Sequence, residues 1–133
     1  MLSAKAGKEA VIRVGSELGV LSQVTKAISE KGISLLAICA WEEGDEGIIR
    51  VVTDDHRRTM DVLIEQNLEP LEGEVVIMTV PHRTGMIRHL SADLTEYGIS
   101  IKCMYGTAPV NEDACMIVLA TSDTDRTIVA LNR

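Results

Sequence analysis

The feature that most constrains the fold of this chain is an internal repeat. The phrase EKGISLLAICAW at residues 30–41 returns as EYGISIKCMYG at residues 96–106. Gly98 minus Gly32 gives an offset of 66, and the same Ile-Ser pair follows each glycine. A chain of 133 residues has room for such a unit about twice. The repeat therefore predicts two small, similar modules that share a surface.

The first copy begins with a strand and a helix. Residues 10–14 (AVIRV) are short and β-branched, which is typical of a strand. The next apolar residues recur on a period of about 3.6, which predicts a helix. Gly32 ends it, because glycine adopts the left-handed conformation of a helix end without steric penalty. The apolar stripe consists of Val20, Leu21, Val24, Ala27 and Ile28.

A hairpin and a second helix complete the first copy. Residues 33–41 and 48–52 predict two strands, joined by a turn at the acidic stretch EEGDEG, residues 42–47. Both sides of the strand 33–41 are apolar, so we expect cover on both sides. The run TDD at residues 53–55 can cap a helix that reaches about Asn67.

The same order restarts in the second half of the chain and then stops early. Residues 75–80 predict a strand, and a helix follows the loop 81–85. Residues 99–105 and 114–120 predict the second hairpin, and residues 123–133 open the last helix before the chain ends. The second copy therefore has no final strand of its own.

The element order β-α-β-β-α-β, with short links, predicts an α+β fold of two ferredoxin-like repeats, at residues 8–73 and 74–133. Each repeat should be an antiparallel sheet with both helices on one face. In this topology the final strand lies beside the first, so residues 75–80 would form an open, apolar edge. We expect a strand from the first copy or from a second chain to cover that edge, with a homodimer as the assembly.

Composition and charge exclude several classes of partner. Thirteen Lys and Arg against twenty Asp and Glu give a net charge of −7, which repels a nucleic acid on average. No apolar stretch reaches the roughly 18 residues that span a bilayer, and the N-terminal sequence lacks the apolar core of a signal peptide. We therefore expect a cytoplasmic protein without a membrane partner.

The cysteines and histidines do not form a metal-binding pattern. Cys39, Cys103 and Cys115 lie in apolar strand-like runs without C-x-x-C spacing, as reduced core thiols do. The three histidines also lack the spacing of metal ligands. The acidic turn at 42–47 could hold a cation, but an exposed turn is the simpler interpretation. We expect neither a metal nor a cofactor.

The repeated motifs resemble the ACT domain, a regulatory module of amino-acid metabolism. The resemblance covers nearly the whole chain from about residue 9, and its tandem layout is similar to small stand-alone bacterial proteins of two ACT repeats. It rests on the strand, the helix openings Gly19-Val20-Leu21 and Gly85-Met86-Ile87, and the Gly-Ile-Ser that begins at Gly32 and Gly98. The resemblance implies a non-enzymatic regulatory module that binds a free amino acid or a related small metabolite near a repeat or subunit interface.

The resemblance places the ligand in the loop between strand one and helix one of each repeat. A glycine at the helix entrance allows close approach to the backbone, and the first-turn amides suit a carboxylate. The family's common loop has Asp or Asn three residues before this glycine and Pro directly before it, and this chain has neither, so the ligand's identity stays open. The matching positions are Ser16, Glu17, Leu18, Gly19, Val20 and Leu21, and His82, Arg83, Thr84, Gly85, Met86 and Ile87.

Simpler roles and other functions stay open beside this one. The two loop glycines could serve only a tight turn, Ser16 could cap the helix, and Arg83 could be a surface charge. The acids Asp54, Asp55, Asp123 and Asp125 are explained by capping. The chain could also be an interaction scaffold without a ligand, or an acylphosphatase-like hydrolase with Arg83 holding a phosphate. The loop lacks an Asn to orient water and a nucleophile beside a base, which favours the binding module.

Overall fold

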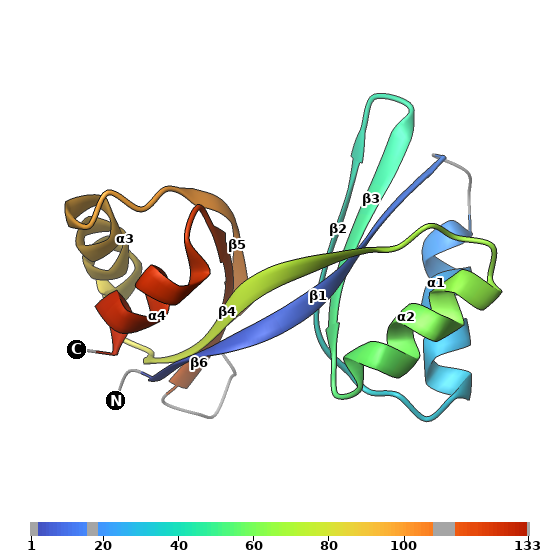
Figure 1. Cartoon of the computed structure of the whole chain (residues 1–133), viewed down its shortest axis with the longest axis horizontal. Coiled ribbons are helices and arrows are strands. Elements are labelled where there is room, and N and C mark those ends of the chain that lie inside the picture. The colour runs from blue at the N-terminus through green and yellow to red at the C-terminus, as the bar shows by residue number, and fades with distance from the viewer. Residues whose placement is uncertain (1–2, 16–18, 108–113, 133) are drawn as a thin grey trace. The chain divides into compact units, whose positions relative to one another are not determined.

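The computed structural model describes residues 3–15, 19–107 and 114–132 (Figure 1). Its elements confirm the expected α+β order, with short connections. They are β1 (Ser3–Gly15), α1 (Val20–Glu30), β2 (Leu35–Glu43), β3 (Glu46–Thr53), α2 (His56–Glu65), β4 (Leu71–Pro81), α3 (Met86–Glu96), β5 (Ile101–Thr107), β6 (Ala114–Thr121) and α4 (Thr124–Leu131).

The chain divides into two compact units, and two long strands contribute to both. Lys8–Gly73 forms the first-repeat unit, and Met1–Gly7 with Glu74–Arg133 forms the second-repeat unit. The hydrogen-bonded strand order is β2-β3-β1-β4 in the first-repeat unit and β1-β4-β6-β5 in the second. Strands β1 and β4 are therefore each used twice, once by either unit, and each unit contains two helices.

The strand missing from the second repeat is supplied by the start of β1. Ala4 is only 7% exposed and belongs to the same apolar core as Val76 and Met78 of β4. The side chain of Asn132, just after α4, binds the Ala4 backbone twice. Its Oδ1 accepts a hydrogen bond from the Ala4 amide at 2.9 Å, and its Nδ2 donates to the Ala4 carbonyl at 2.8 Å. The expectation that a strand from the first copy covers this edge is confirmed.

The core of each unit lies between its helices and one face of its strands. Alternate strand residues face the helices, because side chains along a strand point to opposite sides in turn. As the absence of Phe requires, both cores are largely aliphatic. The first-repeat core contains Ala10, Ile12, Val24, Ala27, Ile28, Ile33, Ile49, Val51, Val62 and Leu63, and the second contains Ala4, Val76, Met78, Val80, Leu90, Leu94, Ile99, Ile117, Leu119, Ala130 and Leu131.

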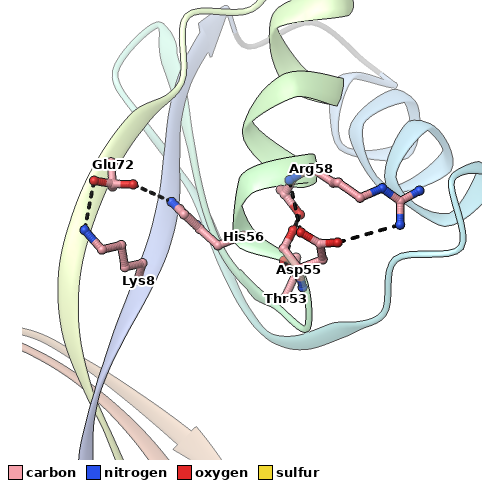
Figure 2. A network of polar contacts seen from close by, with 7 residues as sticks. Lys8, Thr53, Asp55, His56, Arg58 and Glu72 are labelled. Atoms are coloured by element: carbon pink, nitrogen blue, oxygen red, sulfur yellow. Dashed lines mark hydrogen bonds and ion pairs between the residues drawn. The ribbon is translucent and has the colours of Figure 1, made fainter.

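One polar motif joins strand to helix in both units. In the first, the Asp55 side chain caps α2 by accepting from the Arg58 amide at 3.2 Å, and the hydroxyls of Thr53 and Thr59 pair at 2.7 Å (Figure 2). The Arg58 guanidinium donates to the Lys31 carbonyl at the end of α1, at 2.7 Å. The start of α2 is thus fixed to the end of α1.

The second unit repeats this motif residue for residue. Asp123 accepts from the Arg126 amide at 3.1 Å, Thr121 pairs with Thr127 at 2.8 Å, and Arg126 donates to the Tyr97 carbonyl at 2.6 Å. The capping role predicted for Asp55 and Asp123 is therefore confirmed. These aspartates are explained by structure alone.

A second polar network lies on the first-repeat unit. Glu72 at the start of β4 accepts a hydrogen bond from Lys8 of β1 at 3.0 Å and contacts His56 of α2 at 2.8 Å (Figure 2). The hydrogen bond from Lys8, and then that with His56, lowers the pKa of the Glu72 carboxyl below its usual value. The Glu72 side chain is about half exposed, so the network should contribute little to stability.

Several predicted boundaries differ from the structure. Strand β1 starts seven residues before the predicted Ala10 (10 minus 3). The hairpin turn is only Gly44 and Asp45, with Gly44 at φ +61°, because the acids on either side continue the strands. Helix α2 ends at Glu65 rather than near Asn67. No described helix is long and apolar enough to cross a membrane.

Within the described part of the single chain, β2 is not covered on both sides, so the expected second cover stays a prediction. Strand β2 lies at the edge of the sheet, where only β3 pairs with it. Leu36 is 52% exposed and Ile38 is 42% exposed, although Ile38 is paired with the core residue Val51. An edge strand projects beyond the helices that cover the centre, so even its helix-side residues meet solvent.

Candidate functional site

The loop glycines singled out by the sequence begin a helix in both units. Gly19 is the N-cap of α1 at φ +89°, and Gly85 is the N-cap of α3 at φ +86°, neither with a side-chain cap. This left-handed conformation strains any other residue, although a Cβ at either position would meet no atom within 4 Å. The N-cap position of α1 belongs to Gly19, and the capping role considered for Ser16 stays a prediction. Ser16, Glu17 and Leu18 lie outside the described residues.

The first-repeat unit has a cavity of about 420 Å³ where α1 begins, which we call the first-repeat cavity. Three of the predicted ligand positions line it, namely Gly19, Val20 and Leu21. The rest of its lining comes from the end of β1 and from the β2–β3 hairpin, and consists of Val14, Gly15, Ala40, Trp41, Glu42, Gly47, Ile48 and Ile49.

The second-repeat unit has a cavity of about 300 Å³, the second-repeat cavity. Of the six positions predicted in this repeat, only Ile87 lines it. His82, Arg83, Thr84 and Gly85 are exposed in the loop, and Met86 packs against the apolar core. The remaining lining comes from the hairpin and consists of Met104, Tyr105, Gly106, Thr107, Cys115 and Ile117.

The two cavities occupy equivalent places in the repeat. Leu21 corresponds to Ile87 (87 minus 21 gives 66), and Ile49 corresponds to Ile117 (117 minus 49 gives 68, because the second hairpin is longer by two). Sequence reasoning missed the hairpin residues that line both cavities. The signal that could have found them is the hairpin's own repetition at these offsets.

Strand register determines what each hairpin residue contributes to the first-repeat cavity. Ala40 pairs with the core residue Ile49, and Glu42 pairs with Gly47, so all four lie on the helix side. Trp41 pairs with Ile48 on the opposite side, where its ring centroid lies 5.9 Å from the Arg50 guanidinium carbon. Among the described residues, the cavity therefore has an aliphatic floor and one carboxylate, from Glu42.

Backbone amides at the start of α1 supply positive potential to this cavity. The first α-helical hydrogen bond of α1 runs from the Gln23 amide to the Gly19 carbonyl at 2.9 Å. The amides of Val20, Leu21 and Ser22 precede it, and the first amides of an α-helix have no partner within the helix. Because these amides carry the positive end of the helix dipole, the site suits a small carboxylate. No group of three or more metal-ligating side chains occurs among the described residues.

A buried ion pair lies on the helix-free side of the first-repeat sheet. Glu9 of β1 is 1% exposed and forms an ion pair with Arg50 of β3. Within the described part of the chain, Arg50 Nε is buried without a hydrogen-bond partner. The second repeat has Val75 (75 minus 9 gives 66) and Val118 (118 minus 50 gives 68) at these positions, each 1% exposed. The first repeat thus has a buried ion pair at the two positions where the second repeat has buried valines.

Solved structures share this fold over nearly the whole chain. The crystal structure of protein BT0572 from Bacteroides thetaiotaomicron matches with a TM-score of 0.89 and 26% identity, over 97% of this chain and 88% of that one. The ligand-free regulatory subunit of aspartate kinase from Thermus thermophilus matches with a TM-score of 0.70 and 11% identity, over 98% and 94%. That from Thermus flavus matches with a TM-score of 0.64 and 13% identity, over 99% and 94%.

These matches show the fold, two ferredoxin-like repeats. Among the described residues, no strand follows α4. No protein-family model matches the chain, and no curated protein matches it in sequence.

Proposed function

We propose that this protein is a non-enzymatic regulatory module that binds a free amino acid or a related small metabolite where helix one of a repeat begins. The observation that carries the proposal is the first-repeat cavity, which brings Gly19, Val20 and Leu21 together with an aliphatic floor. Its volume of about 420 Å³ falls in the range of about 300–1,000 Å³ that is usual for small-molecule sites.

The fold supports the same assignment. The solved structures from the two Thermus species are regulatory subunits of aspartate kinase, not catalytic ones. We propose that residues 8–73 and 74–133 of this chain are ACT-like repeats with the same kind of role. The loops Ser16–Leu21 and His82–Ile87 are the proposed ligand-binding segments.

Thermal unfolding in the presence of each of the twenty amino acids tests the proposal. A ligand at 100 times its Kd stabilises the folded state by about 2.7 kcal/mol, and for a chain of this size we expect a rise in Tm of roughly 5–15 °C. The rise should be specific to one amino acid or to a few related ones. A scaffold that binds no amino acid would show no rise with any of them.

A matched pair of glycine variants locates the response. Gly19→Ala places a Cβ at the cavity, whereas Gly32→Ala introduces a similar strain at the other end of α1, where φ is +73°. Both variants should melt earlier than wild type, by a similar amount. Only Gly19→Ala should lose the ligand-induced rise in Tm. If the ligand raises the Tm of both variants equally, the start of α1 is not part of the binding site.

We further propose a cytoplasmic homodimer that uses the edge strand β2. Its apolar residues Leu35, Leu36, Ile38 and Trp41 are all more than a third exposed, and such an edge favours strand pairing. The first-repeat cavity borders this strand, so a second copy would lie close to the ligand. No disulfide joins the three cysteines, in keeping with a reducing compartment.

Light scattering on the wild type at micromolar concentration should give the mass of a dimer. Ile38→Lys should shift it to the monomer, because the strand would carry a charge into the interface. The control is Ile64→Lys on α2, another exposed isoleucine, which should stay dimeric. A monomeric wild type would rule out this assembly.

A further inference from the structure

The lining of the first-repeat cavity indicates which amino acids it can take. On the helix side, its described lining contains five aliphatic side chains, one carboxylate from Glu42 and no basic side chain. Within the described residues, the Glu42 carboxylate has neither an ion pair nor a hydrogen bond. A lone carboxylate in the lining of an apolar cavity suits a cationic group, such as the ammonium group of an amino acid. The aliphatic residues are Val14, Val20, Leu21, Ala40 and Ile49.

The space in front of Glu42 is provided by a glycine on the neighbouring strand. Gly47 pairs directly with Glu42, and both lie on the helix side of the sheet. A Cβ at Gly47 would lie 3.3 Å from the Cγ2 atom of Val14, closer than most real contacts. A larger residue at position 47 would therefore narrow the passage between the carboxylate and the aliphatic floor.

We propose that the first-repeat cavity selects an α-amino acid with an aliphatic side chain, and that Glu42 receives its ammonium group. The proposal rests on the function proposed above and specifies its ligand class. The ligand carboxylate lies toward the amides of Val20 and Leu21, and the side chain lies on the aliphatic floor. Aspartate and glutamate are rejected because their second carboxylate meets no cation. Lysine and arginine are disfavoured because their charged ends would lose water against aliphatic groups.

The second-repeat cavity lacks the features of this site. No charged side chain belongs to its described lining, and the residue equivalent to Glu42 is Ala108 in the sequence (108 minus 42 gives 66). Cys115 occupies the position of Gly47 (115 minus 47 gives 68), so a side chain fills the place that the glycine leaves open. The proposal therefore gives one amino-acid site per chain, in the first repeat.

Calorimetric titration of the full chain tests this assignment with defined probes. We expect L-leucine, L-isoleucine or L-valine to bind at one site per chain. The 2-keto acid analogue of leucine, 4-methyl-2-oxopentanoate, carries a ketone oxygen in place of the ammonium group and should bind at least about tenfold more weakly. L-aspartate and L-lysine should bind more weakly than the aliphatic amino acids.

Two isosteric variants separate the role of Glu42 from that of general charge. Glu42→Gln should weaken binding of the aliphatic amino acid by about 10- to 100-fold and remove most of the preference over the keto acid. Glu43→Gln removes the same charge from the next residue of β2, which does not line the cavity, and should leave the affinity unchanged. Both residues are exposed, so both variants should fold, as far-UV circular dichroism will show.

The outcomes distinguish this inference from the proposed function. Tight binding of aspartate or lysine, equal effects of the two variants, or two sites per chain would overturn the ligand assignment and leave an amino-acid-binding module in place. If none of the twenty amino acids binds at millimolar concentration, the proposed function itself fails and the assignment fails with it.

Discussion

Replacing Arg50 by alanine is expected to destabilise the chain by about 3–5 kcal/mol, because the Glu9 carboxylate would stay buried without the guanidinium. Glu9 is 1% exposed, and the pair lies at the centre of the first-repeat sheet between β1 and β3. For a protein of ordinary stability, about 5–15 kcal/mol, this loss is large. Urea unfolding followed by circular dichroism will measure it. The chain's one tryptophan is a poor probe here, because it lies beside Arg50.

The second repeat suggests the double variant that should restore stability. Glu9→Val together with Arg50→Val reproduces the buried valines Val75 and Val118. Because an apolar pair avoids the desolvation of two charges, we expect the double variant to be as stable as wild type or more stable. Arg13→Ala is the control, since its pair with Glu46 is exposed and should contribute less than about 1 kcal/mol. If the double variant is as unstable as Arg50→Ala, the charges themselves stabilise the fold.

Removing residues 2–7 is expected to unfold the edge of the second-repeat unit. Strand β4 would lose its backbone hydrogen bonds to β1, each of which contributes about 1 kcal/mol to the free energy of unfolding. The apolar core would also lose Ala4. The exposed edge should then pair between chains. Amide exchange along residues 75–80 should accelerate, and light scattering should detect aggregates.

Two comparisons make this result specific to the strand. Asn132→Ala deletes both side-chain hydrogen bonds to Ala4 but keeps the strand, so it should cost about 1–3 kcal/mol and cause no aggregation. Amides of β3 belong to the first-repeat unit and should keep their protection in both variants. Slow exchange along residues 75–80 in the truncated chain would show that β4 does not depend on β1.

The fold was largely predictable because the pattern of the repeat occurs twice in the sequence. Apolar periods, helix-ending glycines and the capping aspartates gave the element order correctly. The long start of β1 was not predictable, because SAKAGKE lacks the β-branched residues that mark a strand and is held in place by its partners. The turn was misjudged because acids around Gly44 resemble a loop, whereas their exposure at an edge lets them continue the strands.

The site was predictable only where it depends on local backbone. Gly19 and Gly85 were identified as helix entrances, because a glycine before an apolar period signals a turn. The hairpin residues that line each cavity were missed, because it is strand pairing that brings them close to the start of the helix. Glu42 in particular was assigned to the acidic turn, and only the register with Gly47 places it on the cavity side.

Because β1 and β4 contribute to both units, the order of the segments in the sequence differs from their grouping into units. Residues 1–7 precede the first-repeat unit in sequence but complete the second, where Ala4 is bonded to Asn132 near the other end of the chain. If those residues were moved to follow Arg133, each unit would be an uninterrupted β-α-β-β-α-β stretch. The grouping of these residues is therefore that of a circularly permuted tandem repeat. A break between Gly73 and Glu74 would not separate two domains, because it would cut β4 and leave the N-terminal strand covalently attached to the wrong half.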